Sequence, residues 1–217
     1  MRTRAPRTLL VSALAVFAVV ASGCAPAEPQ PSGSPSAAPS SAAPSPSPSA
    51  TSSEANALVT VDGLSIDDGP LIAYADHEAV LAALGDIVGP VPAPQGPDEY
   101  GFTSYDWDGA VRLNVAESGP AALWIGSADT PGVVFTVADG IGIGATREEA
   151  LAAGAEELPM DDDGDGVNDY LAVGTREVPG TASLVRPGEV GVEYVMLALD
   201  GDTVSKIFGL ADDFSDL

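Results

Sequence analysis

A long segment of alanine, proline and serine limits which part of this chain can fold. Residues 25–56 contain no aromatic and no branched aliphatic side chain. Such a segment cannot bury enough apolar surface to offset the entropy lost on ordering, so we expect a disordered, partly polyproline-like tether. When extended at about 3 Å per residue, it would reach roughly 100 Å. Its composition would also suit O-glycosylation, and the folded part is expected within residues 57–217.

The N-terminus has the pattern of an export signal. Arg2, Arg4 and Arg7 precede an apolar run over Leu9–Ala21. A helix of that length rises about 20 Å, which is too short for a bilayer core of about 30 Å. We therefore predict a cleaved signal peptide over residues 1–23.

The chain's single cysteine directly follows this signal. The sequence Ala21-Ser22-Gly23-Cys24 resembles the lipobox of bacterial lipoproteins, with alanine where leucine is usual. The resemblance implies that Cys24 carries diacylglycerol and acyl chains such as palmitate. The predicted location is extracytoplasmic, anchored to the bacterial cell membrane through lipid at Cys24. A plain secreted protein is the alternative.

The charge of residues 57–217 narrows the class of binding partner that we expect. Residues 57–217 contain 30 acidic and five basic side chains. A field of that sign repels phosphate backbones and favours cations, so we predict no nucleic-acid partner. The same charge would also serve solubility alone.

Three pairs of segments within the folded part resemble each other. They are residues 60–66 and 136–143, residues 76–85 and 146–154, and residues 105–115 and 197–207. This pattern predicts two tandem repeats, over residues 57–132 and 133–217. Chance similarity in a sequence rich in alanine, glycine and aspartate is the alternative.

Each predicted repeat contains one helix. Thr146 and Glu149 have the spacing of a capping box, so a helix should begin there. Asp76 can cap the first-repeat helix, with Gly85 as its C-terminal stop.

Strands are expected to follow each helix. Asp108-Gly109 and Asp200-Gly201 are typical of hairpin turns, and apolar residues alternate over residues 111–115. The predicted fold class is therefore α+β, with a helix packed on one face of an antiparallel sheet in each repeat.

Two short motifs resemble a known family. GIGIGATREEA (residues 140–150) and EAVLAALG (residues 78–85) are similar to the opening and the close of a motif in small BamE/SmpA-type outer-membrane lipoproteins and in the β-lactamase inhibitory protein. The resemblance implies a helix-on-sheet repeat that recognises proteins or holds assemblies together. It carries over no catalytic residue.

The stretch MDDDGDGVNDYLAV (residues 160–173) has the spacing of a calcium loop. Alternate side chains of a tightly curled loop converge, and hard carboxylate oxygens suit a hard cation. The predicted ligands are Asp161, Asp163, Asp165, the Val167 carbonyl and Asp169.

This loop resembles the shortened loops of thrombospondin type 3 proteins more than a complete EF-hand. Ala172 stands where a bidentate glutamate is expected, so further oxygens would come from water, Glu157 or Glu177, and Asp162 should point outward. We expect weak Ca²⁺ binding, with a dissociation constant on the order of 10⁻⁴ to 10⁻³ M, that braces the loop. A solvated acidic turn is the alternative.

Signals for catalysis are few. His77, the only histidine, lies in the first turn of a predicted helix, where a surface role is expected, and no hydrolase elbow or phosphate loop is present. A set of aromatic side chains could line a sugar-binding or protein-binding face, although core packing is the expected role; they are Tyr100, Phe102, Tyr105, Trp107 and Trp124.

The predicted function is a non-catalytic binding module stabilised by calcium, with an envelope protein or a glycan as possible partner. A hydrolase using a carboxylate pair is one alternative, and it requires two acids in a cleft roughly 5 to 10 Å apart. A purely structural envelope protein is the other.

Overall fold

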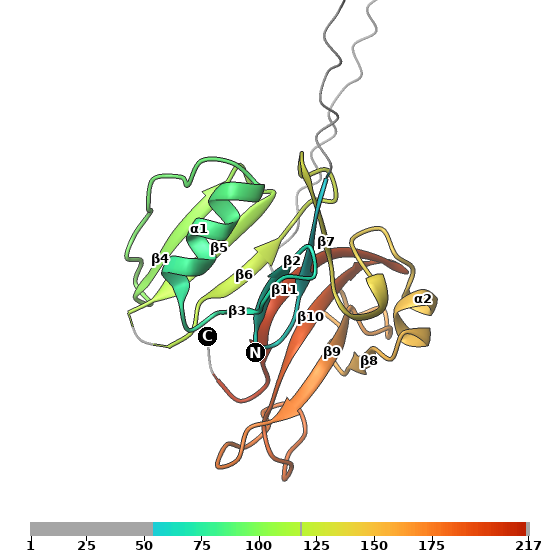
Figure 1. Ribbon diagram of the computed structural model, residues 1–217. Coiled ribbons are helices and arrows are strands. Elements are labelled where there is room, and N and C mark those ends of the chain that lie inside the picture. Colours follow the sequence, from blue (N-terminus) through green and yellow to red (C-terminus); the bar gives the residue numbers. More distant parts are fainter. Residues whose placement is uncertain (1–53, 118, 216–217) are drawn as a thin grey trace, which may run out of the picture. The chain divides into compact units, whose positions relative to one another are not determined.

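The computed structural model of the chain describes residues 54–117 and 119–215 (Figure 1). In chain order its elements are β1 (Ala55–Val59), β2 (Gly63–Ile66), β3 (Ile72–Ala73), α1 (His77–Ile87), β4 (Phe102–Trp107), β5 (Val111–Ala116), β6 (Ala122–Ile125), β7 (Val133–Thr136), the 3-10 turn η1 (Ala138–Gly140), α2 (Arg147–Ala152), β8 (Glu156–Leu158), β9 (Tyr170–Glu177), β10 (Val192–Asp200) and β11 (Thr203–Asp212). The predicted signal peptide, Cys24 and nearly all of the predicted tether lie outside the described residues. Neither helix of the described part is long and apolar enough to cross a membrane.

The strands form two sheets. A four-stranded sheet has the order β3-β2-β1-β7, in which β1 and β7 are parallel and the other pairs are antiparallel. A seven-stranded antiparallel sheet has the order β4-β5-β6-β11-β10-β9-β8. Figure 1 shows β4, β5 and β6 at one end of the larger sheet and the long strands β9, β10 and β11 towards the other.

The predicted α+β fold of two helix-on-sheet units is wrong, because the described part is mostly β. Strands from the two predicted repeats pair with each other, β1 with β7 and β6 with β11. The second predicted helix is only six residues long, since Ala153 ends it and Gly154 turns the chain with φ +90°. Alternation of apolar and polar residues predicts a strand but does not identify the strand that pairs with it. The resemblance between segments therefore could not show that strands of the two predicted repeats would pair with each other.

One face of the seven-stranded sheet forms the main core. Val111, Leu113, Leu123, Ile125 and Ile207 alternate along adjacent strands and are almost completely buried. They join a single apolar cluster with residues of the four-stranded sheet and of α1. Alternation in β5 thus encodes which face of the sheet is buried.

A close contact in this core requires glycine. A Cβ atom at Gly209 on β11 would stand 2.2 Å from the Tyr74 hydroxyl oxygen. Tyr74 is 1% exposed, its hydroxyl makes no hydrogen bond with a described residue, and burial raises its pKa well above the usual range. The tyrosine ring therefore fills space that a side chain at position 209 would occupy.

The opposite face of the larger sheet, which we call the outer face, is covered by described residues at only one end. A second cluster of buried residues, Leu158, Ala172 and Tyr194, lies on β8, β9 and β10. Met160, Tyr170 and Met196 pack against it. Towards β5 and β6 the outer face has no comparable buried cluster among the described residues.

The local signals at helix starts are confirmed. The Asp76 carboxylate accepts a hydrogen bond from the Ala79 amide at the start of α1. Thr146 and Glu149 form the full capping box of α2. Gly85 does not end α1, which continues to Ile87.

Candidate functional site

The Asp-rich loop connects β8 to β9. Asp161, Asp163 and Asp169 each offer a carboxylate oxygen, and these atoms lie within 4.8 Å of one another. Three of the five predicted ligands are therefore brought together. Without a cation, carboxylates this close repel one another, so the arrangement favours a positively charged ion.

Backbone amides hold the first carboxylate in place. The two oxygens of Asp161 accept hydrogen bonds from the amides of Gly164 and Gly166, at 2.7 and 2.9 Å. Both glycines have positive φ, +78° and +90°, which lets the chain curl around the aspartate. The Asp163 carboxylate likewise accepts the Asp165 amide at 3.0 Å.

The other predicted ligands are not part of the converging group. Asp165 accepts a hydrogen bond from the Val167 amide at 2.7 Å, and ligation by Asp165 and by the Val167 carbonyl stays a prediction. Glu177 lies at the far end of β9, so at about 3.3 Å per residue it is roughly 23 Å from the start of that strand and cannot reach the loop. Glu157 is hydrogen-bonded to Arg147 and Asn168.

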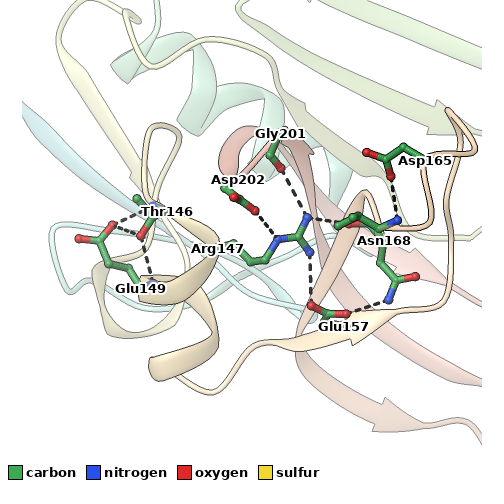
Figure 2. A network of polar contacts seen from close by, with 9 residues as sticks. Thr146, Arg147, Glu149, Glu157, Asp165, Asn168, Gly201 and Asp202 are labelled. Carbon is green, nitrogen blue, oxygen red and sulfur yellow. Dashed lines mark hydrogen bonds and ion pairs between the residues drawn. The ribbon is translucent and has the colours of Figure 1, made fainter.

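Arg147 fastens the end of the loop to the rest of the sheet (Figure 2). Its guanidinium donates to the Asp202 carboxylate at 3.0 Å, to Glu157 at 3.3 Å and to the Asn168 carbonyl at 2.8 Å. The Asn168 amide group donates in turn to Glu157 at 2.8 Å. The Arg147 side chain is only 13% exposed and its contact with the Asn168 carbonyl is partly buried, whereas the carboxylates of Glu157 and Asp202 are exposed. The Arg147 guanidinium thus joins α2, β8, the loop and the β10–β11 turn.

Tyr170 fixes the other side of the loop. Its hydroxyl donates to the Asp162 carboxylate at 2.5 Å, and this hydrogen bond is the main reason why the pKa of Tyr170 rises to about 12. The Asp162 amide donates to the Asp169 carboxylate at 2.6 Å. Asp162 was expected to point outward, and it binds Tyr170 rather than joining the converging carboxylates.

The open end of the outer face carries aromatic and basic side chains. Arg112, Trp124 and Phe208 stand opposite one another on the adjacent strands β5, β6 and β11. The Trp124 and Phe208 rings meet edge to face with centroids 5.0 Å apart. The Arg112 guanidinium carbon lies 5.9 Å from the Trp124 ring centroid, within the range of a cation–π contact.

At this end of the outer face Arg112 forms an ion pair, whereas Lys206 forms none with a described residue. Arg112 donates through Nε and Nη2 to one oxygen of Asp106, whose other oxygen accepts the Gly109 amide. The Gly109 hydrogen bond and then the Arg112 guanidinium hold the pKa of Asp106 below its usual range. Lys206 is exposed and forms no ion pair with a described residue.

A shallow groove of about 210 Å³ runs between these side chains. Its lining consists of Gly109, Arg112, Trp124, Ile125, Gly126, Lys206 and Phe208. No carboxylate of the described residues lines it, although the folded part carries 30 acids. We call this groove and its lining the outer-face patch.

A larger groove of about 440 Å³ lies beside β7 and α2. Glu149 is the single acid that lines it, and that carboxylate is already bound by the Thr146 amide and hydroxyl. These hydrogen bonds hold the pKa of Glu149 below its usual range, opposite to what a general acid requires. Neither of these two grooves, in the part of the chain that the structure describes, holds a pair of acids.

Sequence reasoning grouped Trp124 with four other aromatic residues, expected core packing for all of them, and did not name the partners of Trp124. Of the aromatics that it grouped, Trp107 is 8% exposed whereas Trp124 is 41% exposed. The sequence signal for Arg112, Lys206 and Phe208 was alternation. Each lies one position away from a buried residue of β5 or β11, so its side chain points to the opposite face of the sheet. That signal becomes usable only when β5, β6 and β11 are known to be neighbours. His77 is half-buried in the first turn of α1 and lines neither groove.

Comparisons with known proteins return no relative. No protein-family model, no curated protein and no solved structure matches this chain. The lipobox and the calcium-loop resemblances stay predictions, and the helix-on-sheet fold implied by the BamE/SmpA resemblance is wrong.

Proposed function

We propose that this protein is a non-catalytic binding module of the cell envelope, tethered by lipid at Cys24 and stabilised by calcium. The observation that carries the proposal is the uncovered end of the outer face, where Trp124 is 41% exposed. Trp124 does not stand alone, because Phe208 and Arg112 contact its ring, and tryptophan is enriched at binding interfaces. The outer-face patch is the binding surface.

The scaffold suits binding rather than conformational change. Arg112, Trp124 and Phe208 project from three strands that pair with neighbours on both sides. Side chains on such strands are held more rigidly than side chains on loops, so little ordering entropy is lost when a partner binds.

Calcium acts in this proposal as a brace away from the binding surface. Support comes from the converging oxygens of Asp161, Asp163 and Asp169 and from the anchoring of the same loop by Arg147. The loop also carries Met160, which packs on the buried cluster of Leu158, Ala172 and Tyr194. A bound Ca²⁺ would hold the loop, and with it Met160, over this cluster.

The binding role can be tested on the full chain with its lipid site removed by Cys24→Ser. Envelope fragments from the native cells are pelleted with this protein, and the fraction that sediments is measured. Trp124→Ala should reduce that fraction at least threefold. Tyr100→Ala, which removes a side chain of a residue that is 69% exposed and outside the patch, should leave it unchanged. Equal sedimentation of all three proteins would show that the proposed binding surface is wrong.

A further inference from the structure

The outer-face patch combines features that point to one class of ligand. Trp124 presents an exposed aromatic ring, and the edge-to-face contact with Phe208 fixes its orientation. The faces of indole rings carry negative potential and attract weakly positive C–H groups. The C–H face of a pyranose sugar offers several such groups on one nearly flat surface.

The charged side chains that line the groove beside the ring are basic, although the protein as a whole is acidic. Two of the five basic side chains of residues 57–217, Arg112 and Lys206, line the groove, and no described acid does. Arg112 uses Nε and Nη2 for Asp106, so its Nη1 group makes no hydrogen bond with a described residue. Lys206 has three donors and no acidic partner in the described part. Both cations can therefore donate to a carboxylate that lies beside Trp124.

We infer that the outer-face patch binds a glycan through a pyranose residue that bears a carboxylate. The sugar ring stacks on the part of the Trp124 ring that Arg112 and Phe208 leave exposed, and its carboxylate accepts hydrogen bonds from Lys206 and Arg112 Nη1. The groove, at about 210 Å³, is below the range of enclosed ligand pockets and suits a single sugar ring lying on the surface. This inference rests on the proposed binding role of the same face and does not depend on the calcium loop.

Backbone pairing argues against a peptide as the occupant. Extended peptides commonly bind by adding a strand to an exposed sheet edge. At the patch, β5, β6 and β11 all have neighbours on both sides, so their backbone groups are used within the sheet. The larger acidic surface also disfavours polyanions such as nucleic acids. A single carboxylate escapes most of that repulsion, because charges beyond about 8 Å are screened at physiological ionic strength.

The test uses the full chain with Cys24→Ser and two matched probes, galacturonic acid and its methyl ester. Tryptophan fluorescence reports the patch, because Trp107, the other tryptophan, is 8% exposed and its indole N–H is bonded to the Gly89 carbonyl. Saturable binding of the acid is expected, at least fivefold tighter than binding of the ester. Calorimetry confirms the affinities.

Variants separate local contacts from net charge. Lys206→Gln should weaken binding of the acid at least threefold and leave binding of the ester unchanged. Arg186→Gln, which removes the same charge from a loop outside the patch, should leave both affinities unchanged. Trp124→Phe, which keeps an aromatic ring in the sheet, should weaken binding of both probes.

The inference is overturned if the acid and the ester bind equally, if neither binds, or if Lys206→Gln and Arg186→Gln have the same effect. It is also overturned if a short peptide of aspartate and leucine binds more tightly than the acid. If the probes fail while Trp124→Ala still reduces sedimentation with the envelope at least threefold, only the ligand class is wrong. If sedimentation is also insensitive to Trp124→Ala, the proposed function itself is wrong.

Discussion

The two ends of one sheet face differ in almost every physical respect. At the β8–β9–β10 end the outer face is covered, and Leu158 and Ala172 are each 2% exposed. At the β5–β6–β11 end the same face is open, and Trp124 is 41% exposed. The residues Ala172, Met196, Phe208, Trp124 and Arg112 stand opposite one another from strand to strand, so the two ends are parts of one continuous row.

The polar contacts show the same contrast. At the covered end Arg147, 13% exposed, joins four separate segments, and Tyr170 binds the loop from the sheet. At the open end Arg112 has a side chain that is 43% exposed and, among the described residues, a single acidic partner, Asp106. The covered end is thus built for stability, while the open end keeps donors and an aromatic ring available to a ligand.

The largest expected effect distinguishes the two arginines. Arg147→Met should lower the free energy of unfolding by about 2–3 kcal/mol, because the Asn168 carbonyl loses a charged donor in a partly buried site and Glu157 and Asp202 lose their ion-pair partner. Arg112→Met should cost at most about 1 kcal/mol, since the Arg112 side chain is 43% exposed and forms a single ion pair with a described residue. Urea unfolding of the two variants measures both values. Equal losses would remove the distinction between a stabilising end and a binding end.

Calcium should act on the covered end alone. With a dissociation constant of 10⁻⁴ to 10⁻³ M, 10 mM Ca²⁺ should stabilise the protein by about 1.4–2.7 kcal/mol. The melting temperature should rise by roughly 3–10 °C. Asp163→Asn should abolish the increase, whereas Asp129→Asn, an exposed aspartate outside the loop, should keep it. A melting temperature that does not respond to Ca²⁺ would exclude the metal brace.

The smallest expected effect is a pH dependence at the open end. The pKa of Asp106 is lowered in the folded state, so its contribution to stability is present above its unfolded pKa of about 3.9 and is lost as pH falls through the folded pKa. Wild type should be more stable than Asp106→Asn at pH 7, by less than about 1 kcal/mol. Unfolding in urea should show this difference shrinking below about pH 4. A difference that stays constant from pH 3 to 7 would contradict the assignment.

The local parts of the fold could be predicted from sequence, whereas the pairing of strands could not. The capping residues Asp76 and Thr146 mark both helix starts because a cap acts within one turn of the chain. The parallel pair β1–β7 joins segments more than seventy residues apart, and nothing in either short strand specifies the other. Pairing of strands between the two predicted repeats is the reason why the prediction of two separate units was wrong.

The candidate sites show the same difference between local and long-range features. The loop over residues 161–169 is a local pattern, so its spacing predicted three carboxylates that the fold brings together. The outer-face patch draws its residues from β5, β6 and β11, which are neighbours only in space. Arg147 escaped notice for the same reason, because it contacts Asp202, which is 55 residues later in the chain.

The central claim, that one end of the outer face is a cation-stabilised cover and the other a ligand surface, has a direct test. Amide NMR spectra of the full chain with Cys24→Ser are recorded during titration with Ca²⁺ and then with galacturonic acid. We expect Ca²⁺ to shift the amides of Gly164 and Gly166 and to leave those of Arg112, Trp124 and Phe208 in place, and we expect galacturonic acid to do the reverse. Shifts at the same residues with both ligands, or no shift of Gly164 and Gly166 with Ca²⁺, would contradict the claim.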